Sequence, residues 1–206
     1  MRARVFDDLR LRRPQVLALC LDIIGWSLGA AIASNFTRNV GNKVVRKLML
    51  HAMAGADPDG PGLHKSPVLI LRYLPLCGDY LLETLALSVI KKGYAHMLAD
   101  RADDGKMLSL LVDHAKWNKM LGHAIVLTIS CDEMFDNTAT LAFLGESRTK
   151  DTTLITWCEL DKTVPTPRNN EALCPLATHK ILKDVGHGAH LTHPEVLFEL
   201  WLDFLT

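Results

Sequence analysis

Apolar and polar positions near the start of the chain follow first a strand pattern, then a helix pattern, then a strand pattern again. A short apolar run ends at Ile24 and predicts a buried strand. Small residues dominate positions 27–38 and predict a helix, and a second apolar run over positions 44–53 predicts another strand. A strand, a helix and a strand at this spacing form a βαβ unit, which implies a parallel sheet.

The pattern changes character over residues 57–150. This range opens with a loop rich in Pro and Gly, and the apolar residues after it recur mainly at helical spacing. Helix-like patterns cover residues 80–90, 94–98 and 106–121, with a less regular stretch as far as Leu144. We therefore expect a helical insertion here, rather than further strands.

Strand and helix patterns alternate again after residue 150. Residues 152–157 and 179–185 predict two strands, with a short helix between them that begins at Pro167 and is capped by Thr166. A closing helix is predicted from Pro194, because apolar residues then recur at helical spacing: Val196, Leu197, Leu200, Trp201, Phe204 and Leu205. The predicted fold class is therefore α/β, with a parallel sheet and a helical insertion.

Composition fits a globular protein of one domain with an insertion. The chain has 206 residues, of which 49% are hydrophobic, so it can bury a core. Its 23 basic and 23 acidic residues cancel to a formal net charge of zero. We expect no nucleic-acid partner, because no basic patch with interleaved aromatic residues is present.

The cysteines and the apolar runs bear on location. The cysteine count is odd and includes no CxxC pair, which favours free thiols in a reducing compartment over disulfides or zinc: Cys20, Cys77, Cys131, Cys158 and Cys174. No apolar stretch reaches the roughly 18 residues of a membrane span. A basic stretch before a short apolar run is typical of signal peptides, but Asp22 interrupts this run and no small-residue cleavage site follows. We therefore expect a cytoplasmic protein.

The most informative motif is G-x-S-x-G at residues 25–29, placed between the first predicted strand and the first predicted helix. A serine hydroxyl is a poor nucleophile unless it is exposed beside a base. A sharp strand-to-helix turn exposes it, and the glycines two residues to either side would let the backbone make that turn. Ser27 is therefore a candidate nucleophile; the alternative is a serine that merely caps the helix.

Three segments together resemble the α/β-hydrolase family. Residues 23–33 resemble its nucleophile elbow and the helix that follows. Residues 157–165 resemble its acid loop, usually written G-x-x-D-x-x-x-P, with Cys158 in place of the usual glycine. Residues 185–195 resemble its histidine loop and last helix, and the order Ser, Asp, His matches the family. The resemblance implies an α/β-hydrolase core and a helical cap or lid: residues 1–56 and 151–206 for the core, residues 57–150 for the cap.

The resemblance also implies a role for each site residue. Ser27 would attack an acyl carbon, His187 would accept and return the proton, and Asp161 would orient the imidazole. The backbone N–H of Leu28 would donate to the oxyanion. No cofactor is needed for this chemistry, and neither G-x-G-x-x-G nor a phosphate-binding loop occurs in the sequence.

Some of these assignments have rivals in the sequence. Glu159 or Asp184 could take the place of Asp161. His190 and His193 recur at intervals of three residues after His187 and could replace it, or the three could bind a metal. A metal is disfavoured because no carboxylate or cysteine completes a recognisable ligand pattern. We expect His190 to lie at the surface of the loop and His193 to cap the last helix.

The short N-terminal region departs from the family pattern. Only 26 residues precede Ser27, whereas the family places about four strands and a second oxyanion donor, on a His-Gly loop, before its nucleophile. The resemblance therefore implies an N-terminally truncated core in which residues 21–24 form an open sheet edge. A second copy of the chain or another partner could cover that edge.

Two functions remain compatible with the sequence. One is a serine hydrolase that cleaves an ester or related acyl bond of a hydrophobic small molecule. The other is a non-catalytic, truncated pseudo-hydrolase or fragment that acts in binding. Apolar residues of the cap suit a hydrophobic substrate, although they could equally pack the core of the cap itself: Leu69, Leu71, Leu74, Leu81, Leu82, Met97, Leu110 and Leu111.

Overall fold

A parallel four-stranded sheet forms the centre of the protein in the computed structural model. The structure describes residues 20–57, 88, 91–95, 97–98, 105–117, 136–167 and 169–206. Every strand pairs with its neighbour in the parallel sense, and the order across the sheet follows the sequence: β1 (Leu21–Trp26), β2 (Val45–His51), β3 (Thr153–Cys158) and β4 (Thr178–Leu182). The predicted α/β class and the predicted parallel βαβ unit are both confirmed.

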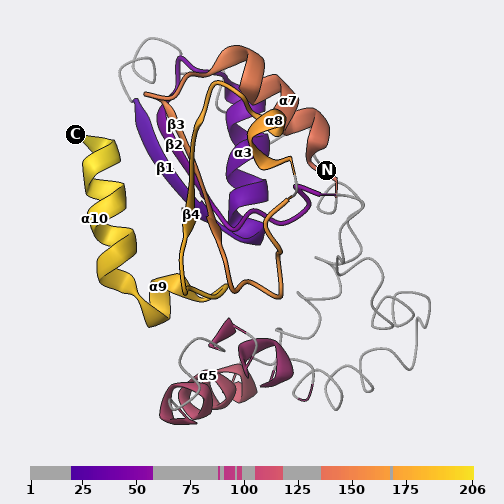
Figure 1. Ribbon diagram of the computed structural model, residues 1–206, viewed down its shortest axis with the longest axis vertical. Helices are drawn as coiled ribbons and strands as arrows, with labels where there is room; N and C mark the ends of the chain where they lie inside the picture. Colours follow the sequence, from indigo (N-terminus) through magenta and orange to yellow (C-terminus); the bar gives the residue numbers. More distant parts are fainter. Residues whose placement is uncertain are drawn as a thin grey trace.

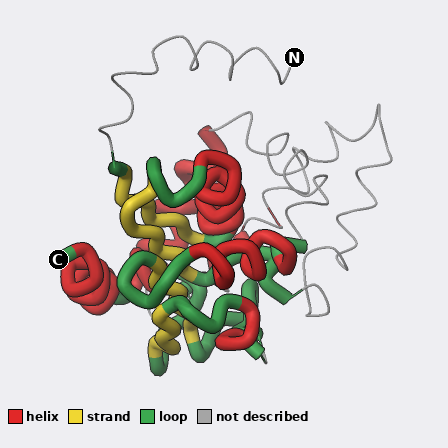
Figure 2. Tube along the Cα trace, turned by 90° about the horizontal axis from the view of Figure 1, so that it is seen from above, coloured by secondary structure: helices red, strands yellow, loops and turns green. Residues whose placement is uncertain are grey.

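Helices cover both faces of this sheet. The described helices are α3 (Leu28–Val40), α5 (Gly105–Trp117), α7 (Thr138–Ser147), α8 (Asn170–Leu173), α9 (Ala189–Thr192) and α10 (Pro194–Leu205). Helices α3 and α7 lie on one face of the sheet, and α10 lies on the other (Figure 1). The view from above shows the same three layers, with the strands between α10 and the remaining core helices (Figure 2).

Alternating residues of the central strands supply the core of both layers. On β2, Leu48 and Leu50 are buried against α3 and α7, whereas Met49 packs with Leu154 of β3 and Leu200 of α10. Both faces of the central strands are apolar because both are covered. His51, the last residue of β2, belongs by this alternation to the α10 face.

Helix α7 packs with the sheet rather than apart from it. Its Leu141 and Leu144 are almost fully buried in the same cluster as α3 and the central strands. This helix closes the range 57–150, which the sequence assigns to a cap. Most of that range lies outside the described residues, so the cap itself stays a prediction, while α7 is part of the core layer.

Positive backbone angles set the ends of two strands. The second strand ends at His51 rather than at residue 53, because Ala52 has φ 46°. The fourth strand ends at Leu182 rather than at residue 185, and the positive φ of Asp184, 57°, excludes an extended strand as far as residue 185. Such angles are incompatible with extended backbone.

The helix predicted to begin at Pro167 is wrong in its start and in its cap. Helix α8 begins only at Asn170, and its N-cap position is Asn169. Thr166 instead directs its hydroxyl at the carbonyl of Cys158, at a distance of 3.5 Å. The Thr-Pro pair therefore belongs to the loop after β3.

Strand β1 forms one edge of the sheet that the described residues build, and there it pairs with β2 alone. Leu21 and Ile24 are 39% and 43% exposed. A second copy or another partner at this edge stays a prediction. None of the helices in the described ranges combines the length and the hydrophobicity that a bilayer span requires.

Candidate active site

Ser27 occupies a strained turn between β1 and α3. Its φ of 52° and ψ of −117° lie in a region that costs a non-glycine residue about 1–3 kcal/mol. The turn brings strand and helix so close that a Cβ on Gly25 would lie 2.5 Å from the Cα of Ala30. Glycine at position 25 is therefore a steric requirement of this turn.

The two glycines of the motif are not equivalent. The sequence assigns both of them to making the turn. A Cβ added to Gly29, however, would meet nothing within 4 Å, and its φ is not in the left-handed region. Only Gly25 is required by close packing, so the expectation for Gly29 is wrong.

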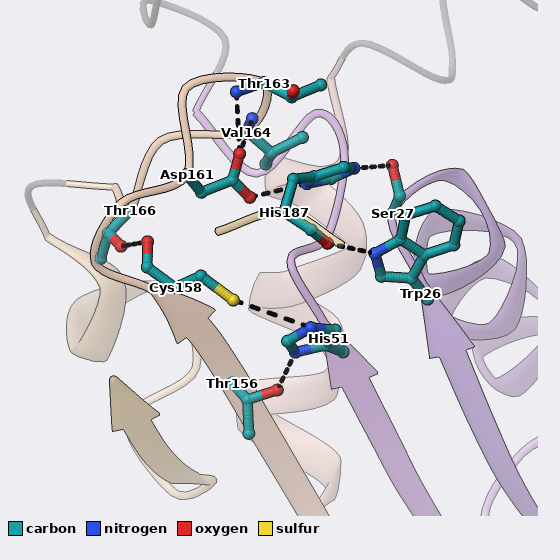
Figure 3. A network of polar contacts seen from close by, with 10 residues as sticks. All are labelled: Trp26, Ser27, His51, Thr156, Cys158, Asp161, Thr163, Val164, Thr166 and His187. Carbon is teal, nitrogen blue, oxygen red and sulfur yellow. Dashed lines mark hydrogen bonds and ion pairs between the residues drawn. The ribbon is translucent and has the colours of Figure 1, made fainter. Parts of the chain in front are cut away.

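Hydrogen bonds from β2 and the segment after it hold the serine backbone. The N–H of Ser27 donates to the carbonyl of His51 at 2.8 Å, and the N–H of Ala54 donates to the carbonyl of Ser27 at 3.1 Å. Ser27 is the N-cap residue of α3, yet its side chain makes no capping hydrogen bond. The hydroxyl points instead to His187, where Nε2 lies 3.0 Å from Oγ (Figure 3).

Asp161 lies in the loop after β3 and is almost fully buried. One carboxylate oxygen, Oδ1, accepts the backbone N–H groups of Thr163 and Val164, both at 2.8 Å. The other, Oδ2, lies 2.6 Å from Nδ1 of His187. Because the first two bonds fix the carboxylate, the second oxygen is held toward the imidazole.

The structure thus brings together Ser27, His187 and Asp161, the three residues singled out by the sequence. It does not bring the rival carboxylates into this arrangement. Glu159 is exposed and accepts the backbone N–H of Asp184 at 3.1 Å through its carboxylate. The oxyanion candidate, Leu28, is the first residue of α3, so its N–H has no acceptor within the helix.

Trp26 holds the histidine loop from the other side. Its indole N–H donates to the carbonyl of His187 at 2.9 Å. The indole ring also packs against His190, with ring centroids 4.1 Å apart. His190 is therefore half-buried in α9, and the expectation of a surface loop residue is wrong. His193 does stand at the N-cap of α10, but its side chain makes no capping bond and contacts Thr192 instead.

The main residue that the sequence reasoning missed is His51, at the end of β2. Its ring is fully buried, with Nδ1 2.7 Å from Oγ1 of Thr156 and Nε2 3.7 Å from Sγ of Cys158. Burial, and secondarily the neighbouring His187 and His190, lowers its pKa to about 4. A signal was available, because side chains at the carboxyl ends of parallel strands commonly line sites.

The described residues Met97 and Leu98 lie at the histidine loop. The N–H of Gly188 donates to the carbonyl of Met97 at 3.1 Å, and a Cβ on Gly188 would lie 2.8 Å from that oxygen. Leu98 beside it is buried. Part of the range assigned to the cap therefore contacts the residue that follows His187.

The fold and this geometry can be compared with known proteins. The model of the alpha/beta hydrolase family matches residues 3–200, which is nearly the whole chain. The chain belongs to the alpha/beta hydrolase family. No curated protein matches its sequence.

Solved alpha/beta hydrolases share the fold at low sequence identity. Bromoperoxidase from Bacillus anthracis matches with a TM-score of 0.72 and 16% identity, over 96% of this chain and 71% of that one. MGS-M2, an alpha/beta hydrolase from a Medee basin deep-sea metagenome library, has a TM-score of 0.64, 18% identity, and 98% and 70% coverage. The meta-cleavage product hydrolase of Pseudomonas fluorescens has a TM-score of 0.65, 16% identity, and 98% and 67% coverage.

Proposed function

We propose that the protein is a serine hydrolase that cleaves an ester or related acyl bond of a hydrophobic small molecule. The observation that carries the proposal is the continuous series of contacts from Asp161 through His187 to the hydroxyl of Ser27, at 2.6 Å and 3.0 Å. Membership of a hydrolase family supports it. Neighbours named as a bromoperoxidase and a meta-cleavage product hydrolase share the fold, so the fold alone does not select the bond.

Acylation begins at Ser27. Its Oγ attacks the acyl carbon while Nε2 of His187 accepts the hydroxyl proton, and Asp161 stabilises the imidazolium through Nδ1. The tetrahedral intermediate then collapses, the acyl–oxygen bond breaks, and the departing alcohol takes the proton from His187. A water molecule, deprotonated by His187, hydrolyses the acyl-enzyme and releases the acid.

The developing oxyanion requires fixed hydrogen-bond donors. The N–H of Leu28 is suited to this role because it is the first amide of α3, next to the nucleophile, and the positive end of the helix dipole lies there. Removing one oxyanion donor typically costs about 10²–10³ in rate. The identity of a second donor would therefore matter for activity.

The hydrophobic substrate class and the cytoplasmic location complete the proposal. The substrate class rests on apolar residues of the range 57–150, most of which lie outside the described residues. Met97, which belongs to that set, contacts the histidine loop through its carbonyl. The location rests on cysteines that form no disulfide, of which Cys20, Cys158 and Cys174 are among the described residues.

Labelling with a fluorophosphonate probe tests the proposal, because this probe phosphonylates only activated serines. We expect the parent protein to be labelled, and Ser27→Ala and His187→Ala to abolish labelling. Ser34→Ala is the matched control: Ser34 is a buried serine of the same helix whose hydroxyl donates to the carbonyl of Ala31. This control should be labelled like the parent.

The alternative function is a non-catalytic binding protein of the same fold. A parent protein that is folded, as judged by circular dichroism, but does not react with the probe would contradict the hydrolase proposal and favour this alternative. Labelling that survives Ser27→Ala would contradict the assignment of the nucleophile.

A further inference from the structure

Three buried polar side chains lie behind the candidate site, on the α10 face of the sheet. They are His51, Thr156 and Cys158, and each is at most 2% exposed. The ring of His51 contacts Thr156 through Nδ1 at 2.7 Å and Cys158 through Nε2 at 3.7 Å (Figure 3). Burying a polar group costs free energy unless its hydrogen bonds are made. Because each ring nitrogen of His51 has a polar partner, these three side chains form a specific arrangement.

The backbones of His51 and Cys158 hold the nucleophile and the acid. The carbonyl of His51 accepts the N–H of Ser27 at 2.8 Å. The carbonyl of Cys158 accepts the N–H of Asp161 at 3.2 Å. The contact between the two side chains therefore joins the residue that anchors Ser27 to the residue that anchors Asp161.

Cys158 also contacts the third segment of the site. It packs in one small cluster with Val185 and Ala189, which flank the His187 loop, and with Leu197 of α10. The thiol thus lies between the base of that loop and the ring of His51. A displacement of either ring or thiol would be transmitted to all three segments that carry the site.

The charge state of His51 fits a role in positioning. Burial lowers its pKa to about 4, with His187 and His190 adding to the effect and Asp161 opposing it. At neutral pH the ring is therefore uncharged, and it does not oppose the positive charge that forms on His187 during acyl transfer. It acts through its shape and its two polar contacts.

We propose that His51 is a positioning residue for acyl transfer. Together with Cys158, it fixes the position of the Ser27 turn relative to the Asp161 and His187 loops. The inference rests on the proposed hydrolase function and assigns part of its machinery. It also accounts for a cysteine at position 158, where the family's acid loop usually has glycine: the thiol fills the space beside the His51 ring.

Two substitutions at His51 separate positioning from folding. His51→Leu roughly keeps the volume but removes both polar contacts, and His51→Gln keeps a polar amide on a side chain of similar length. We expect the kcat for p-nitrophenyl butyrate to fall about 10- to 100-fold in His51→Leu, because displacements of about 1 Å in a catalytic arrangement can cost about 100-fold. The KM should stay within about twofold, and His51→Gln should recover part of the loss.

Cys158→Ala tests the link between the two residues. It should lower kcat too, and the double variant with His51→Leu should be no slower than the slower single variant, since both substitutions remove the contact between His51 and Cys158. Ser34→Ala, the buried serine that contacts neither residue, should leave kcat unchanged. Melting temperatures measured on every variant would show whether each one is folded.

The outcomes distinguish this inference from the proposed function. A parent protein that hydrolyses no ester and takes no fluorophosphonate label overturns both. A parent that is active, with folded His51→Leu and Cys158→Ala variants that match its kcat, overturns the positioning role alone. Fully additive losses of kcat in the double variant would also overturn it, because two residues that act through one shared contact cannot have independent effects.

Discussion

The turn that carries Ser27 and the loops that carry Asp161 and His187 are built in different ways. The shape of the turn is set by residues next to one another in sequence, through a positive φ at Ser27 and a glycine at position 25 where no Cβ fits, while His51 and Ala54 attach the turn to β2 and the segment after it. The two loops depend more on residues far away in sequence, although Thr163 and Val164 hold the Asp161 carboxylate locally. The carbonyl of His187 is held by Trp26, 161 positions earlier, and Cys158, which contacts the ring of His51, packs with Val185 and Ala189 on either side of His187.

This difference indicates where each kind of damage should appear. A change that disturbs the turn acts directly on the nucleophile, because Ser27 is part of the turn. A change around the loops leaves the protein folded but displaces Asp161 and His187 relative to Ser27. A change that forces the turn open should abolish function, and a change among the residues that support the loops should lower it by a measurable factor.

Gly25→Ala should have the largest effect. The added Cβ would lie 2.5 Å from the Cα of Ala30 and 2.6 Å from the carbonyl oxygen of Gly29, both backbone atoms that cannot move without opening the turn. We expect labelling by a fluorophosphonate to fall by at least about 10⁴-fold, since removing a nucleophile costs that much or more. Overpacking should also lower the free energy of unfolding by about 1–3 kcal/mol. Labelling at the parental rate would show that the turn is more tolerant than its geometry implies.

Asp161→Asn should have the next largest effect, although the backbone stays in place. The amide can still accept the N–H groups of Thr163 and Val164, but it no longer selects the imidazole tautomer that leaves Nε2 free to accept a proton. A loss of about 10⁴-fold in kcat is expected for such a change. Glu159→Gln provides the matched control, because that carboxylate only accepts the N–H of Asp184. Equal losses in the two variants would contradict the assignment of the acid.

The difference between local and distant contacts also explains how much of the fold and the site could be predicted from the sequence. The Ser27 turn, the parallel strands and the start of α10 follow from local patterns, and the structure has them close to where the patterns put them. The order of Ser27, Asp161 and His187 identified candidates, but their distances depend on the whole sheet. The place of His51 at the carboxyl end of a predicted parallel strand was a signal, but its contacts with Thr156 and Cys158, like the Trp26–His190 contact, join strands or loops that only the fold brings together.

His51 makes stability depend on pH in a defined direction. Its pKa is about 4 in the folded protein and 6.5 in an unfolded chain, so between these values the unfolded chain binds a proton that the folded one does not. The free energy of unfolding should therefore fall as the pH is lowered from about 6.5 to 4, by about 3 kcal/mol if the whole shift is realised. Urea titrations at several pH values would measure this slope. His51→Leu should flatten it, whereas the exposed His114→Gln on α5 should leave it unchanged.

Gly29→Ala should have the smallest effect, and it is the sharpest test of the contrast within the turn. The substitution is the same as at Gly25 and lies only four residues away, yet its Cβ would meet nothing within 4 Å. Since Gly29 lies in the first turn of α3, replacing it by alanine should raise the free energy of unfolding by up to about 1 kcal/mol. Labelling should stay within about twofold of the parent. If Gly29→Ala instead abolished labelling while the protein remained folded, both glycines would serve the nucleophile, and the steric requirement could not be assigned to Gly25 alone.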